Sequence, residues 1–137
     1  MNKIVTFGVY DYFHLGHLRL FEQAKKYGDY LIVAVQDGNY ILKYKPDAKV
    51  LYSTEERVEI IKALRVVDEV VVYESVGAAA LEKIDFDTLA LGEDHKGGRF
   101  DEVIAWCKEH GKQVVRLKRT PGIASSDIKK ELSKKIH

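Results

Sequence analysis

The feature that most constrains the fold is a continuous apolar run at residues 30–35, Tyr-Leu-Ile-Val-Ala-Val. Apolar and polar residues do not alternate within it, which predicts a strand buried on both faces, as in a parallel sheet. A similar run, residues 4–7, precedes it and ends at Gly8. Between the two lies an amphipathic segment that begins near Leu15 and predicts a helix. Strand, helix and strand in this order are typical of a βαβ unit.

The same alternation continues along the rest of the chain. Ser53 and Glu56 form a capping-box pattern, which predicts a helix with Arg57 in its first turn and Arg65 near its last. After it we expect strands at 66–73, 88–91 and 114–117 and helices at 78–83 and 100–110. These elements predict one domain, residues 1–137, of the α/β class. Its core would be a single doubly wound, Rossmann-like, five-stranded parallel sheet with the site at the carboxyl ends of the strands.

Residues 37–52 interrupt this alternation with a stretch that we interpret as a long polar loop. It carries several lysines, among them Lys43 and Lys45. A loop of this length inside a compact domain is more often functional than idle, although a solvated excursion explains the composition equally well.

The stretch from Phe7 to His17 predicts a strand, a tight turn and the start of a helix. A glycine at a strand end and the unpaired N–H groups of a helix start together form an anion site. His14 and His17, separated by Leu15 and Gly16, would lie on one helix face as two neutral-to-cationic donors beside a phosphate-sized space.

The same histidine pair could instead form half of a zinc site or a plain surface pair. A zinc site needs further ligands, and the only cysteine is Cys107. The other three histidines show no ligand-like spacing with the pair. We therefore assign no protein-bound metal.

The charge balance limits the classes of partner. The chain has 22 Lys and Arg against 21 Asp and Glu, a formal net charge of +1, so no global basic field indicates nucleic-acid or membrane binding. Any anion site must be local. The single cysteine fits a reducing compartment, and no stretch has the character of a signal peptide or the length to span a bilayer, so we expect a cytoplasmic protein.

The glycine-rich turns match neither a dinucleotide-binding fingerprint nor a Walker loop, and no nucleophile elbow is present. What remains is a set of phosphate donors without an obvious nucleophile, which suits transfer between phosphates because the attacking group is already an anion. The candidates are His14, His17, Lys43 or Lys45, Arg119 and a helix start at Ser125 and Ser126. Ordinary capping of a terminal helix also explains the two serines.

Three segments, residues 8–17, 65–70 and 119–128, resemble the signatures of the cytidylyltransferase-type nucleotidyltransferases. Within that family the resemblance is greatest to the bacterial enzymes that act on glycerol phosphate. It covers nearly the whole chain. The sequence departs from the family pattern at Val9, where threonine is usual, and at Ala124, where serine is usual. His95 stands where an aromatic residue often follows the acidic pair.

The resemblance implies a reaction of CTP with a small phosphorylated alcohol, in the presence of magnesium, that gives a CDP-alcohol and pyrophosphate. It also implies a homodimer. His14 and His17 would stabilise the pentacoordinate α-phosphate, and Lys43 or Lys45 would meet the phosphates or the acceptor. The remaining nucleotide contacts implied are Gly8, Val9, Tyr10, Asp11 and Gly16 for the triphosphate, Arg65, Gly92 and Asp94 for the nucleoside, and Arg119, Gly122, Ile123, Ser125 and Ser126 for the β- and γ-phosphates.

Two alternatives stay open. Residues 65–72 also resemble sugar-phosphate and flavin adenylyltransferases, which use ATP. A nucleotide-binding module that has lost turnover is the third hypothesis, and the intact His14 and His17 argue against it.

Overall fold

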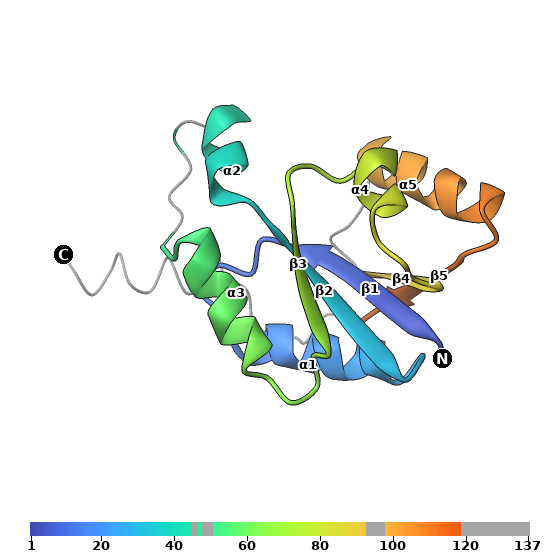
Figure 1. Ribbon diagram of the computed structural model, residues 1–137, viewed down its shortest axis with the longest axis horizontal. Coiled ribbons are helices and arrows are strands. Elements are labelled where there is room, and N and C mark those ends of the chain that lie inside the picture. Colours follow the sequence, from blue (N-terminus) through green and yellow to red (C-terminus); the bar gives the residue numbers. More distant parts are fainter. Residues whose placement is uncertain (45–46, 48–50, 93–97, 119–137) are drawn as a thin grey trace.

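The computed structural model describes residues 1–44, 47, 51–92 and 98–118. Within them, strands and helices alternate along the chain, except that two helices follow one another between the second and third strands (Figure 1). The elements are β1 (Lys3–Gly8), α1 (Leu15–Lys25), β2 (Tyr30–Gln36), α2 (Gly38–Tyr44), α3 (Thr54–Lys62), β3 (Glu69–Tyr73), α4 (Ala78–Glu82), β4 (Thr88–Gly92), α5 (Gly98–Glu109) and β5 (Gln113–Leu117).

The strands form one sheet in the order β3-β2-β1-β4-β5, and every pairing is parallel. The prediction of an α/β fold with a five-stranded parallel sheet is confirmed. All five residues from Leu31 to Val35 are buried, as the continuous apolar run indicated.

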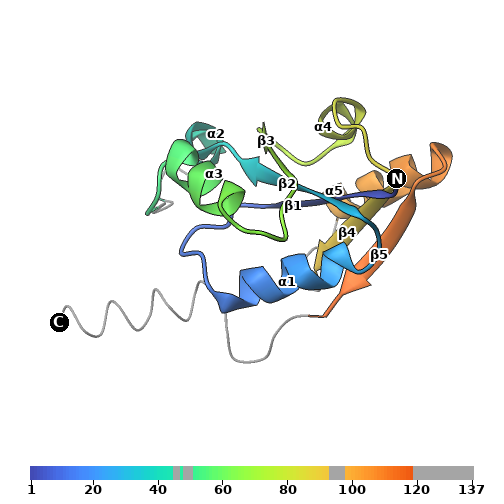
Figure 2. The same cartoon turned by 60° about the horizontal axis from the view of Figure 1, so that its bottom comes forward.

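The helices cover both faces of the sheet (Figure 2). One core cluster joins alternate residues of β2, such as Leu31 and Val33, to Phe21 of α1 and Ile61 of α3. The other joins the intervening β2 residues, Ile32 and Ala34, to Leu81 of α4 and Val103 of α5. Successive strand residues point to opposite faces, so a strand with helices on both sides must be apolar throughout.

Residues 37–52 are not a continuous loop, because they contain α2. Ile41 is 5% exposed and anchors this helix to the body of the domain, and its N–H donates to the carbonyl of Asp37. Seven residues are too few for a clear helical period, which explains why the sequence pattern missed the helix.

The third strand is shorter than expected. It begins at Glu69 rather than at residue 66, because Val67 donates its N–H to the carbonyl of Leu64 in a turn. Asp68 then donates to Leu31, and pairing with β2 starts at Glu69.

Candidate functional site

The order of the strands reverses direction between β1 and β4, and these two strands lie side by side. Thr6 pairs with Ala90, so the strand ends at Gly8 and Gly92 lie at the same edge of the sheet. In open α/β sheets this is the position at which ligands bind. The turn from Gly8 to α1 therefore reaches the edge that the sequence predicted for the site (Figure 1).

The turn after β1 has an uncommon backbone. Tyr10 and Tyr12 have φ angles of 58° and 51°, the left-handed region that non-glycine residues rarely adopt. The ring of Tyr10 folds back over Gly8, where a Cβ atom would lie 2.6 Å from the Tyr10 Cζ atom. Position 8 must therefore be a glycine for the Tyr10 ring to pack in this place. Tyr10 also contacts Phe21 edge-on, with 5.1 Å between ring centroids, and this packing offsets the backbone strain.

The two histidines cap the first turn of α1 reciprocally. The Gly16 N–H donates to the His14 Nδ1 atom at 3.0 Å, and the His14 N–H donates to the His17 Nδ1 atom at 3.3 Å. Their rings stack with 3.9 Å between centroids and an interplanar angle of 19°. A neutral imidazole that accepts at Nδ1 carries its proton on Nε2. The caps therefore make Nε2–H the donor of each neutral ring.

The environment of His17 decides its charge. Its ring contacts Tyr10 and Phe13, with centroid distances of 5.5 and 5.4 Å. Burial, and secondarily the neighbouring His14, lower the pKa of His17 from 6.5 to about 4. The sequence allowed a neutral or cationic donor at this position, and the structure favours a neutral one.

Asp11 fastens the turn to the segment ahead of α3. Asp11 is 6% exposed, and its carboxylate accepts hydrogen bonds from the N–H groups of Leu51 at 2.8 Å and Tyr52 at 3.0 Å. Two backbone bonds to one buried carboxylate fix the position of both segments.

Arg57 is the residue that sequence reasoning missed. It is 1% exposed, and its Nη1 atom donates to the carbonyls of Val9 at 2.8 Å and Gln36 at 2.7 Å. Its Nε atom donates to the Tyr52 carbonyl at 3.3 Å. One guanidinium thus joins the turn after β1, the end of β2 and the start of α3. A cation in the first turn of a helix opposes the helix dipole, and this was the available sequence signal.

The structure brings some of the remaining predicted residues to this edge and separates another from it. Lys43 lies exposed in α2, which follows the carboxyl end of β2, and Gly92 ends β4. Arg65 lies between α3 and β3, at the opposite edge of the sheet, so it does not join His14 and His17 within its own chain. Seven predicted site residues lie outside the described residues, namely Lys45, Asp94, Arg119, Gly122, Ile123, Ser125 and Ser126.

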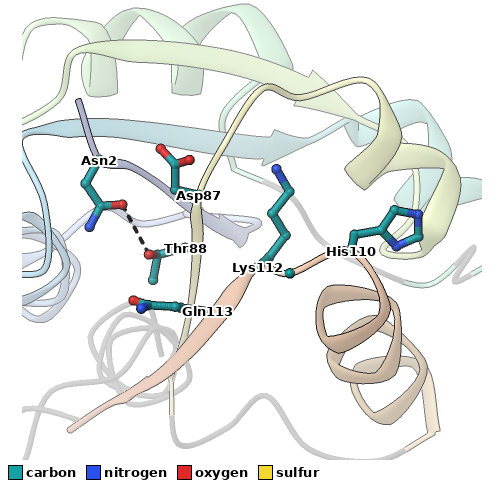
Figure 3. A pocket seen from close by; sticks show the side chains of 7 residues that line it. Asn2, Asp87, Thr88, His110, Lys112 and Gln113 are labelled. Atoms are coloured by element: carbon teal, nitrogen blue, oxygen red, sulfur yellow. Dashed lines mark hydrogen bonds between the residues drawn. The ribbon is translucent and has the colours of Figure 1, made fainter.

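A hollow of about 280 Å³ lies at the edge opposite the histidines, where β4 and β5 begin (Figure 3). Thr88 donates to the Asn2 side chain at 3.3 Å on one side of it, and the His110 ring on the other side is turned away from them. The Lys112 ammonium group donates to the Phe86 carbonyl. These polar groups are engaged within the chain, so the hollow is a surface feature separate from the candidate site.

Within the described ranges, no group of three or more His, Cys, Asp or Glu side chains is arranged to hold a metal ion. In the same part of the chain, none of the helices has the length and apolar character to cross a membrane.

Comparison with known proteins gives concordant results. A model of the cytidylyltransferase-like family matches residues 5–131. Glycerol-3-phosphate cytidylyltransferase of Bacillus spizizenii is 36% identical over 135 residues, which cover 97% of this chain and 98% of the relative. FAD synthase of Ferroglobus placidus is 39% identical over 125 residues, covering 86% of this chain and 77% of the relative.

A solved structure shares the fold. The lipopolysaccharide core biosynthesis protein from Thermoplasma volcanium superimposes with a TM-score of 0.74 at 24% identity, over 88% of this chain and 98% of that protein.

Proposed function

The chain belongs to the cytidylyltransferase-like family, as its sequence motifs predicted, and from that premise we propose that it transfers CMP from CTP to a small phosphorylated alcohol. The products are a CDP-alcohol and pyrophosphate. Glycerol phosphate is the first candidate acceptor, because relatives named for that substrate match almost the full length of the chain.

The stacked His14 and His17 pair at the carboxyl end of β1 is the observation that carries this proposal. In the reaction, an oxygen of the acceptor phosphate attacks the α-phosphorus of CTP and forms a new P–O bond. The bond from that phosphorus to the β-phosphate breaks, and pyrophosphate leaves with the electron pair. Negative charge grows on the α-phosphate oxygens, where the Nε2–H groups of the two histidines would donate.

The reaction needs no strong general base, because the acceptor phosphate is already an anion. This fits a His17 whose pKa lies near 4, since such a ring is a hydrogen-bond donor rather than a proton carrier at neutral pH. The site would act by positioning its reactants and by electrostatic stabilisation.

Other contacts follow from the family motifs. The turn Gly8–Asp11 and Gly16 would hold the triphosphate, with Gly92 and Asp94 near the nucleoside. Lys43 or Lys45 would meet the phosphates or the acceptor. Arg119, Gly122, Ile123, Ser125 and Ser126 would bind the β- and γ-phosphates.

We propose that Mg²⁺ enters with the nucleotide. Magnesium in phosphate-transfer sites keeps several waters and binds the substrate phosphates beside one or two carboxylates. Among the described residues near the histidines, the buried carboxylate is that of Asp11, and both of its oxygens accept backbone N–H groups. These residues fit an ion that is held mainly by the substrate phosphates and water. The ion would neutralise charge on the triphosphate, while the chain's own donors orient it.

An adenylyltransferase is the second candidate, favoured by the 39% identity to an FAD synthase. The two candidates share the phosphate chemistry and differ in the base and in the acceptor. Turnover with CTP or with ATP separates them directly.

We further propose that the protein is a homodimer. The edge strand β3 leaves Val72 53% exposed, and the neighbouring helix α3 leaves Ile60 36% exposed. An exposed apolar edge strand favours pairing with another chain. Light scattering coupled to size-exclusion chromatography would measure the mass, and a strictly monomeric mass would contradict this proposal.

The enzymatic proposal is tested by pyrophosphate release with Mg²⁺, crossing the four nucleoside triphosphates with a panel of phosphorylated alcohols. We expect release with CTP and one acceptor. The variants His14→Ala and His17→Ala should lose most of it, whereas His110→Ala, at the far edge, should retain it. Equal release by all three variants would refute the assignment of the histidines. Release with ATP alone would establish the adenylyltransferase, and CTP binding without release across the panel would favour a binding module.

A further inference from the structure

Phosphate binding does not explain the Phe13 ring beside His17, since a phenyl ring offers no hydrogen-bond donor and no charge. We propose that Phe13 is a positioning residue, whose ring holds the His17 imidazole in the orientation and tautomer in which Nε2 donates to the nucleotide phosphate. The inference rests on the proposed function for its phosphate, but its structural part concerns His17 alone.

Three aromatic rings surround the imidazole of His17. His14 stacks on His17 at 3.9 Å and 19°. Phe13 approaches it at 5.4 Å and 33°, and Tyr10 meets it edge-on at 5.5 Å and 89°. Phe13 is itself held by Phe21 of α1, at 6.0 Å between centroids. The contact between Phe13 and His17 is therefore a fixed part of the site.

The hydrogen bond that His17 accepts at Nδ1 explains why the burial of its ring matters. His17 Nδ1 accepts from the backbone N–H of His14, the residue that caps α1. A protonated His17 would carry a hydrogen on Nδ1, and two donors would then face each other. Protonation of His17 and the reciprocal cap are mutually exclusive. A ring that keeps water from the imidazole disfavours the cation and so preserves the cap.

Among the described residues, the titratable groups whose rings contact His17 are His14 and Tyr10. Tyr10 stays a neutral phenol, because burial raises its pKa above the ordinary value of 10. Burial and the proximity of His14 both lower the pKa of His17. Each of these effects favours the neutral ring, and Phe13 adds to the burial without adding charge.

Two substitutions of Phe13 test whether the apolar character of its side chain, and not only its volume, keeps His17 neutral. Phe13→Leu keeps an apolar side chain over the imidazole, whereas Phe13→Gln places a polar one of similar length there. Because Phe13 is only partly buried, both variants should fold. The protein without substrate, labelled with ¹⁵N-histidine, would be titrated by NMR, which reports the tautomer and the pKa of each ring.

We expect His17 of the wild type to be the Nε2–H tautomer with a pKa below about 5. Phe13→Leu should shift that pKa by less than about half a unit, and Phe13→Gln should raise it by about one unit or more and mix the tautomers. An Nδ1–H tautomer in the wild type, an ordinary His17 pKa, or identical values in the two variants would overturn the proposal.

Activity gives a second readout that a purely structural role would not move. With the accepted nucleotide and acceptor, the wild type and Phe13→Leu should share one kcat/KM profile between about pH 5.5 and pH 7.5, whereas Phe13→Gln should lose activity toward the acid end. Parallel profiles for all three would contradict the proposal. Since NMR needs no substrate, correct His17 spectra without turnover would refute only the proposed function.

Discussion

Replacing Arg57 tests how the turn that carries the histidines is held. In Arg57→Met the carbonyls of Val9 and Gln36 lose their donors at 2.8 and 2.7 Å, and the arginine that supplies these donors is 1% exposed. The substitution removes a buried cation that interacts with two carboxylates. Burial lowers the pKa of this Arg57 guanidinium, and the negative charges of Asp11 and Asp37 raise it. Removing one partner from a buried charge network costs about 3–5 kcal/mol.

Urea unfolding followed by circular dichroism would measure this cost. The midpoint should fall while the slope m stays unchanged, because the folded state keeps its compactness. In a thermal scan the same loss corresponds to a decrease in Tm of roughly 10–18 °C for a domain of this size.

The matched control is Arg19→Met. Arg19 donates to Glu22 one helical turn away, and both side chains are about half exposed. Removing this surface pair should cost less than about 0.5 kcal/mol. A loss below about 1 kcal/mol for Arg57→Met, or equal losses for the two variants, would refute the view that Arg57 joins the three segments.

Three further predictions concern the same edge of the domain. Gly8→Ala should lose about 1–3 kcal/mol of unfolding free energy in urea, because its methyl group would meet a tyrosine ring, whereas Gly98→Ala, with open space around it, should lose none. The pKa of His17 is lower in the folded than in the unfolded protein, so the unfolding free energy should fall by on the order of 2 kcal/mol as the pH drops from 6.5 toward 4. Calorimetry at several pH values would measure this decrease, and His17→Gln should lack it. Ser53→Ala removes the cap that accepts from Glu56 N–H and should cost about 1 kcal/mol by urea unfolding; no loss would contradict that role.

The sheet could be predicted because its signal is local. Residues 30–35 are apolar on both faces, and a strand of that kind is stable only between two helical layers. Helix α2 could not be predicted, since seven residues show no clear helical period and, among its side chains that the structure describes, Ile41 is the one that is buried. The start of β3 likewise depends on a turn that closes at Val67.

The sequence predicted the residue types of the candidate site but not the hydrogen bonds and the charge of its histidines. The spacing of His14 and His17 indicated a shared face, and the rings do stack. Their reciprocal capping and the low pKa of His17 arise from a left-handed turn and from ring packing, which no spacing rule contains. Arg57 was overlooked because its partners are backbone carbonyls, which a sequence does not display. Arg65 was grouped with the site by its motif, yet the strand it precedes places it at the other edge.

We propose that the stacked histidines serve transfer of a nucleotidyl group from CTP, and this transfer changes the phosphorus atoms of both substrates. A ³¹P NMR time course of the protein with CTP, glycerol 3-phosphate and Mg²⁺ would follow these atoms through the reaction. We expect the phosphomonoester signal to be replaced by a pair of coupled diphosphate signals, together with one equivalent of pyrophosphate, and we expect neither product with His17→Ala. Unchanged signals with CTP, alongside diphosphate formation when ATP and a different acceptor are supplied, would contradict it.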